Sequence, residues 1–160
     1  MRRVAITGLG VVSPAGIGVN EFFEGLLTCR SGVTHLSVHH AERLRIRIGA
    51  PIAQFKFDVP KDRSGQLDRY AQLGLAAVRE AWQQAGAAGS FEPDRGGVYF
   101  GTSLGGAATL ETAYIDLFEK NASRVHPMSI IGTMPNSAAA HVAIECGVQG
   151  PSLTYAVACA

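Results

Sequence analysis

The sequence lacks an excess of charge of either sign. Its 14 lysine and arginine residues nearly balance its 13 aspartate and glutamate residues, which leaves a formal net charge of +1 at pH 7. The basic residues form only short clusters, such as Arg2-Arg3. This balance gives no reason to expect nucleic acid or an anionic membrane surface as a partner.

Long apolar runs and abundant cysteine are also missing. No stretch approaches the length of about 20 apolar residues that spans a bilayer. The segment from Met1 to Gly8 turns glycine-rich too soon to be a signal peptide. The three cysteines are an odd number without metal-ligand spacing. We therefore expect no membrane association, and reduced thiols in a cytoplasmic protein.

Apolar residues make up 47% of the 160 residues, which is enough for the core of one domain or of a large part of one. Strand-like and helix-like segments alternate along the chain and predict an α/β layered fold with a mainly parallel sheet. In such folds, sites form beyond the carboxyl ends of the strands. The predicted strands are 4–7, 97–100 and 153–158, and the predicted helices begin near Asn20, at Asp68, near Leu110 and after Asn136.

Two glycine-rich turns follow predicted strands. The first, Gly8-Leu9-Gly10, is typical of dinucleotide-binding proteins, but Ser13 stands where that motif needs its third glycine. The second, Gly101 to Gly106, lacks the lysine of a phosphate-binding loop. Both turns therefore favour close approach of two backbones over nucleotide binding.

The last predicted strand leads to a cysteine. Residues 153–158 carry no formal charge and follow Gly150-Pro151, which is typical of a strand covered on both faces. Such a strand would present Cys159 on a rigid element just before a turn. A helix beginning there would favour the thiolate, which is the nucleophilic form. From local features alone, a small buried hydrophobe at the end of a strand is the favoured interpretation of Cys159. Cys29 and Cys146 are interpreted as packing residues.

The histidines give no local sign of a site. His39 and His40 are adjacent in an irregular stretch, and no cysteine or carboxylate accompanies them at metal-ligand spacing. His141 lies in a predicted helix of small residues and is interpreted as a core residue. We therefore expect neither a metal site nor a cofactor.

Five blocks of the sequence together resemble the β-ketoacyl-acyl-carrier-protein synthases, the condensing enzymes of fatty-acid and polyketide synthesis. The resemblance is to the elongating type, and its blocks occur in the family's order over the whole chain. They are residues 3–14, 68–76, 101–106, 135–142 and 150–160, the last containing Gly150-Pro151-Ser152-Leu153-Thr154 and Ala158-Cys159-Ala160.

The resemblance implies a thiolase-like fold, layered αβαβα, of which residues 1–160 would be the amino-terminal half, ending just after the nucleophile. Cys159 would take an acyl group as a thioester, and a carbanion from decarboxylated malonyl-carrier protein would attack it. The implied partners are acyl carrier protein and a second subunit, in a homodimer or a related heterodimer. The family's two catalytic histidines match none of the five here, so we expect the 160 residues alone to be inactive.

The resemblance also implies substrate-binding residues. Leu104 corresponds in position to an apolar residue that gates the acyl pocket, and Thr133 and Met134 to the pocket lining near the dimer partner. Ala156 and Val157 depart from the family, because hydroxyl residues are common at those positions.

Two other functions stay open at this point. The chain could belong to a non-catalytic binding or scaffold subunit of a synthase complex, or it could be a small α/β domain with a structural cysteine. Rapid alkylation of Cys159 by iodoacetamide at neutral pH favours the enzyme. Equally slow alkylation of Cys29, Cys146 and Cys159 favours the alternatives.

Overall fold

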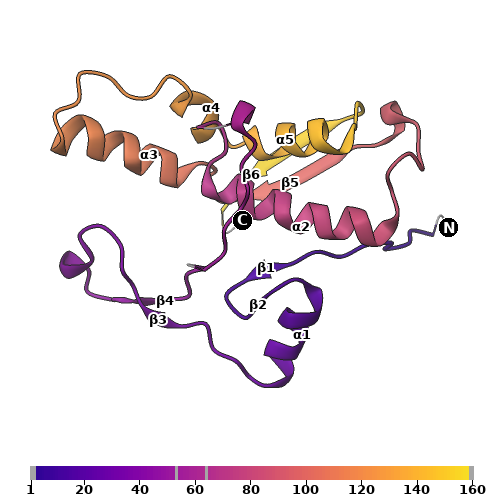
Figure 1. Ribbon diagram of the computed structural model, residues 1–160, viewed down its shortest axis with the longest axis horizontal. Helices are drawn as coiled ribbons and strands as arrows, with labels where there is room; N and C mark the ends of the chain where they lie inside the picture. Colours follow the sequence, from indigo (N-terminus) through magenta and orange to yellow (C-terminus); the bar gives the residue numbers. More distant parts are fainter. Residues whose placement is uncertain (1–2, 53, 64, 159–160) are drawn as a thin grey trace.

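The computed structural model describes residues 3–52, 54–63 and 65–158 (Figure 1). Among these residues, no helix combines the length and the apolar character needed to cross a membrane. The secondary structure is mixed α/β, as the sequence predicted. Its elements are β1 (Val12–Ser13), β2 (Gly16–Ile17), α1 (Val19–Leu27), β3 (Thr34–His35), η1 (Ala41–Arg43), β4 (Ile48–Gly49), η2 (Lys61–Arg63), α2 (Arg69–Ala85), η3 (Pro93–Arg95), β5 (Val98–Thr102), α3 (Ala107–Tyr114), the π-helical turn η4 (Ile115–Glu119), α4 (Ser129–Thr133), α5 (Ser137–Cys146) and β6 (Ser152–Ala156).

The core lies between helices α2 and α5 and the parallel pair β5–β6 (Figure 1). Small side chains let the two helices approach closely, because Ala71, Ala138 and Ala139 are almost completely buried at their contact. Leu75 is the largest fully buried side chain among the described residues. These residues confirm the prediction that the small-residue faces of both helices pack inside the protein.

The two long strands pair in parallel, from Val98 opposite Ser152 to Thr102 opposite Ala156. Two short antiparallel pairs, β1–β2 and β3–β4, complete the strand pairing of the described residues. The inward face of β5 carries Val98 and Phe100, whereas Tyr99 on the other face is 65% exposed. The expectation that the last strand is covered on both faces is wrong for these residues. Tyr155 is 53% exposed, because no described element lies over that face.

The first predicted strand is also absent. Residues 4–7 are not in a strand, and Val4 is 94% exposed. The glycine-rich segment that follows runs along α2. A Cβ on Gly8 or Gly10 would overlap the carbonyl oxygen of Ala81 or Ala77. The predicted close approach of two backbones is thus confirmed for this turn.

Helix α1 begins earlier than predicted, and its cap is supplied from elsewhere in the chain. Gly18, not Asn20, is the N-cap residue, and no side chain of the cap itself binds the helix. Instead, the Glu80 carboxylate of α2 accepts hydrogen bonds from the Val19 N–H (2.7 Å) and the Val11 N–H (2.9 Å). A distant carboxylate thus satisfies the free donor at the helix start.

Both predicted ends of α2 are confirmed. Asp68 caps its start by accepting a hydrogen bond from the Tyr70 N–H (3.1 Å), and Gly86 ends it in the left-handed conformation (φ 58°). Helix α5 likewise ends at Gly147, with φ 67°. These local end signals are strong because they depend on neighbouring residues only.

Candidate active site

Strands β5 and β6 end side by side, which places the segments that follow them at one edge of the sheet. Thr102 and Ala156 form the last pair of the parallel ladder. Leu104 comes two residues after the first strand, and Cys159 three residues after the second. Cys159 itself lies outside the described residues.

The chain turns sharply just before Cys159. Ala158 has a positive φ of 46°, a conformation that costs about 1–2 kcal/mol for a residue with a Cβ. Strained backbone of this kind persists where the surrounding structure imposes it, often at functional sites. The turn predicted after Cys159 lies outside the described residues, whereas Ala158 shows that the backbone already leaves the strand conformation one residue before it.

The second glycine-rich turn rests on the segment that contains Thr133 and Met134. Gly105 has φ 81°, and a Cβ there would lie 2.8 Å from the Pro135 Cα. A Cβ on Gly106 would overlap the Gly132 carbonyl oxygen. This backbone contact brings Leu104 and the Thr133–Met134 segment onto one part of the molecule. Leu104 is 65% exposed and Met134 45% exposed, while the Thr133 hydroxyl donates a hydrogen bond to the Ile130 carbonyl (2.9 Å).

The Tyr70 hydroxyl makes hydrogen bonds to the backbone of this segment. The sequence did not predict this role. The hydroxyl lies 2.7 Å from the Met134 carbonyl oxygen, to which it donates, and accepts a hydrogen bond from the Ala138 N–H (3.2 Å). Burial raises the pKa of this phenol above its usual value. The only sequence signal was a lone tyrosine near the start of a helix face made of small residues.

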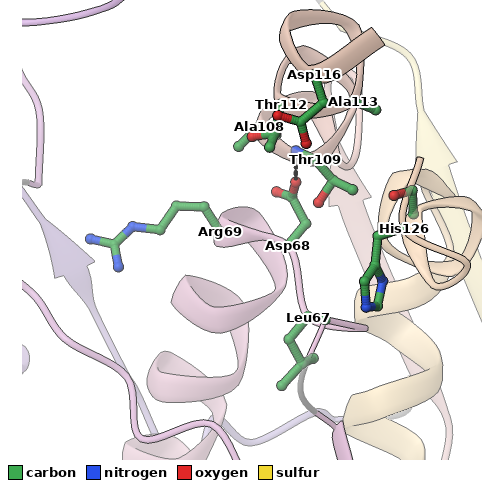
Figure 2. Close-up of a pocket in the computed structure, with 11 residues that line it drawn as sticks. Leu67, Asp68, Arg69, Ala108, Thr109, Thr112, Ala113, Asp116 and His126 are labelled. Atoms are coloured by element: carbon green, nitrogen blue, oxygen red, sulfur yellow. Dashed lines mark hydrogen bonds between the residues drawn. The ribbon is translucent and has the colours of Figure 1, made fainter. Parts of the chain in front are cut away.

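Asp68 joins the starts of two helices beside a cavity of about 290 Å³ (Figure 2). One carboxylate oxygen caps α2 at Tyr70, and the other accepts a hydrogen bond from the Thr109 N–H in the first turn of α3 (2.6 Å). The side chain is only 4% exposed. Two helix N-termini therefore share one buried carboxylate, and α3 is fixed directly after the turn that carries Leu104.

We expect Asp68→Ala to lower the free energy of unfolding by about 2–4 kcal/mol, because two buried N–H donors lose their acceptor. Asp68→Asn keeps one acceptor oxygen and should lose about half as much. Urea unfolding of the two variants beside the wild type measures both values. An alanine variant as stable as the wild type would show that this carboxylate does not hold the two helices together.

His141 lies in α5 and takes no part in the arrangement around Leu104. It is 6% exposed, and its Nδ1 has no hydrogen-bond partner among the described residues. Burial, and next the positive charge of Arg63, lower its pKa below the usual value. The interpretation as a core histidine is confirmed, although one ring nitrogen is unsatisfied.

We expect this histidine to make the protein less stable in mild acid. Because its pKa is lowered on folding, the unfolded chain binds the proton better, and stability falls as pH drops through about 6.5. The loss cannot exceed about 1.4 kcal/mol per pH unit for one proton and stops below the folded-state pKa. Urea unfolding between pH 7.5 and 5 should show a smaller decline for His141→Phe than for the wild type. An identical decline would contradict this assignment.

The other two cysteines differ in surroundings. Cys146 packs against the core, and burial raises the pKa of its thiol. Cys29 is exposed and has a positive φ of 52°, so its interpretation as a packing residue is wrong. The reason is that α1 ends at Leu27, and Cys29 lies beyond it in a left-handed turn at the surface. Exposed Cys29 is therefore the proper accessibility reference for any thiol labelling.

Residues 1–160 match the family model described as "Beta-ketoacyl synthase, N-terminal domain". The chain belongs to this family. It is 30% identical over 162 residues to 3-oxoacyl-[acyl-carrier-protein] synthase 2 of Staphylococcus aureus (strain COL). It is 31% identical over 161 residues to the protein of the same name from Coxiella burnetii (strain RSA 493 / Nine Mile phase I). Each alignment covers 99% of this chain but 39% of the relative, so the chain spans about two fifths of their length.

Solved structures show the same fold. The structure described as the ishigamide ketosynthase/chain length factor superposes with a TM-score of 0.81 at 22% identity, covering 96% of this chain and 39% of the other. A ketosynthase solved in complex with its type II PKS acyl-carrier protein superposes with a TM-score of 0.69 at 26% identity, covering 97% and 38%. The α/β arrangement described above is therefore that of part of a ketosynthase.

Proposed function

We propose that a protein containing this chain is an acyltransferase that joins a carrier-protein-bound acyl chain to malonyl-carrier protein, with Cys159 as the nucleophile. The observation that carries the proposal is the register of β5 and β6. It brings the exit toward Cys159 and the turn bearing Leu104 to the same edge of the sheet. The family to which the chain belongs supports the reaction class.

The proposed reaction proceeds in two steps, acyl transfer and then condensation. The Cys159 thiolate attacks the carbonyl of the acyl thioester, and the carrier thiol leaves, which gives an acyl group on the protein. Malonyl-carrier protein then loses CO₂, and the resulting carbanion attacks the Cys159 thioester. A carbon–carbon bond forms, the carbon–sulfur bond breaks, and the thiolate is restored. The product is a 3-oxoacyl group on the carrier, two carbons longer than the starting acyl chain.

The acyl chain would lie near Leu104, with Thr133 and Met134 lining its pocket. The exposed apolar side chains of Leu104 and Met134, on segments in backbone contact, support this placement. Family resemblance further suggests a five-layered αβαβα body and a dimer, with two copies paired along β6. In support, β5 pairs with one edge of β6, and among the described residues no strand pairs with its other edge. We place the protein in the cytoplasm with its carrier-protein partner.

The proposal concerns a protein that contains these residues together with the rest of such a synthase. We expect residues 1–160 alone to give no turnover, because none of the five histidines matches the family's catalytic pair. A non-catalytic scaffold subunit is the alternative. The cysteine at position 159 disfavours it, since a silent subunit has no need of a nucleophile.

The test is a condensation assay with the full-length protein, acyl-carrier protein and malonyl-carrier protein. Mass spectrometry of the carrier should show a 3-oxoacyl group two carbons longer than the acyl donor, together with released CO₂. A folded full-length protein that binds both carriers yet forms no such product would favour the scaffold alternative.

A further inference from the structure

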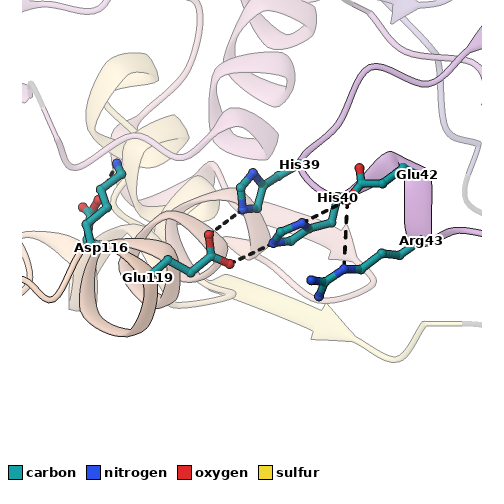
Figure 3. A network of polar contacts seen from close by, with 7 residues as sticks. His39, His40, Glu42, Arg43, Asp116 and Glu119 are labelled. Carbon is teal, nitrogen blue, oxygen red and sulfur yellow. Dashed lines mark hydrogen bonds and ion pairs between the residues drawn. The ribbon is translucent and has the colours of Figure 1, made fainter.

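Two adjacent histidines and a glutamate from distant parts of the chain converge on one point (Figure 3). The Nε2 atom of His39 lies 2.8 Å from one carboxylate oxygen of Glu119, and the Nε2 atom of His40 lies 3.0 Å from the other. The three ligand atoms all lie within 4.8 Å of one another. Glu119, which ends η4, is the carboxylate partner that the local sequence around the histidines did not contain.

The backbone explains why neighbouring side chains can point the same way. Successive residues of an extended segment project to opposite sides, but His40 is in the left-handed conformation, with φ 55° and ψ 29°. The turn it makes before η1 brings both imidazole rings to the same side, with their centroids 3.9 Å apart. Histidine is one of the few residues besides glycine that adopts this conformation with some frequency.

A fourth side chain orients one of the rings. The Nδ1 atom of His40 lies 3.3 Å from a carboxylate oxygen of Glu42. The contact with Glu119 requires a proton on Nε2, because a carboxylate only accepts hydrogen bonds. With an N–H at Nδ1 directed to Glu42, a metal ion would replace the Nε2 proton and bind the lone pair that it leaves. Carboxylates commonly hold metal-binding histidines in this manner.

From this geometry we propose that His39, His40 and Glu119 bind a divalent transition-metal ion of the zinc class. Two imidazole nitrogens and one carboxylate suit Zn²⁺, whereas Mg²⁺ and Ca²⁺ prefer oxygen ligands only. Zinc–ligand distances near 2.1 Å in a tetrahedral site place neighbouring ligand atoms roughly 3.4 Å apart. The two Nε2 atoms lie 2.8 and 3.0 Å from different oxygens of Glu119, and the three ligand atoms all lie within 4.8 Å of one another. Small side-chain rotations would bring them to the tetrahedral spacing. Three protein ligands leave the fourth position to water.

The ion would tie two surface segments together beside an apolar cavity. The cavity has a volume of about 550 Å³, and its wall includes all three ligands together with Leu104, Tyr114 and Phe118. His40 and Glu119 are 79 residues apart in the chain. Metal binding would therefore fix the position of the His39–His40 loop against α3 and η4. This inference does not depend on the proposed condensation activity.

Metal titration of the tag-free full-length protein tests the site. Its thiols are first blocked with iodoacetamide, so that cysteine ligands do not contribute. We expect one equivalent of Zn²⁺ to bind in competition with a chromophoric chelator, and Co²⁺ to give the intense visible bands of a tetrahedral site. Glu119→Gln, His39→Ala and His40→Asn should each weaken binding at least tenfold. His40→Asn is chosen because asparagine also tolerates the left-handed backbone.

Two variants are matched controls. His35→Ala and His126→Ala each remove a histidine outside the cluster and should leave zinc affinity and the cobalt spectrum unchanged. Glu42→Gln should weaken binding less than Glu119→Gln, because its side chain contacts only a ligand. Equal affinity in the wild type and the three ligand variants would overturn the proposal. So would a cobalt spectrum that stays octahedral, or an equal loss in His35→Ala or His126→Ala.

Discussion

Cys159→Ala in the full-length protein is expected to lower the rate of acyl transfer and condensation by at least about 10³-fold, because no acyl thioester can form on the protein. Cys159→Ser should be nearly as inactive. A neutral hydroxyl is a far weaker nucleophile than a thiolate unless a base activates it. The rate is measured as 3-oxoacyl-carrier protein formed per unit time, with the carrier proteins at saturating concentration.

Cys29→Ala is the matched control, since it removes an exposed thiol that the proposed reaction does not use. Its rate should stay within about twofold of the wild type. Circular dichroism and the mass in solution of all three variants, compared with the wild type, show whether they are folded. A folded Cys159→Ala protein that retains most of its condensation rate would contradict the assignment of the nucleophile.

Gly10→Ala is expected to lower the free energy of unfolding by at least about 3 kcal/mol. The added methyl group would overlap the backbone of Ala77 and force the glycine-rich segment away from α2. Two hydrogen bonds that hold this segment to α2 would then break. They are the bonds from the Leu9 N–H to Gln84 Oε1 (2.6 Å) and from the Val11 N–H to the Glu80 carboxylate.

Gly86→Ala is a graded control for the same measurement. Gly86 has a positive φ, but a Cβ there meets no atom within 4 Å, so only the backbone strain of about 1 kcal/mol applies. Urea unfolding should rank Gly10→Ala as the far less stable variant. Equal stability of the two variants would show that the close approach to α2 is unimportant.

Features set by neighbouring residues could be predicted from the sequence. The Asp68 cap, the Gly86 stop and the helix after Asn136 were all predicted correctly, because each depends on a few adjacent side chains. The strand that leads to Cys159 was predicted for the same reason. The exposure of this strand was not predicted, because burial depends on what covers a strand. None of the described residues lies over the outer face of β6.

Features set by distant residues could not be predicted in this way. The cap of α1 comes from Glu80, 61 residues beyond Val19, so the local sequence suggested Asn20 instead. Glu119 meets His39 across 80 residues, which no spacing rule reveals. Leu104, Thr133 and Met134 came from resemblance to a family, and only the glycine contacts at 105 and 106 show why their segments meet.

Peptide mapping of the acylated protein shows directly whether Cys159 carries the acyl group. The full-length protein is incubated with acyl-carrier protein in the absence of malonyl-carrier protein, digested and analysed by mass spectrometry. We expect one acyl group on the peptide containing Cys159, removed by neutral hydroxylamine, and none on Cys29 or Cys146. Condensation activity together with an unmodified Cys159 and an acyl group elsewhere would contradict this expectation.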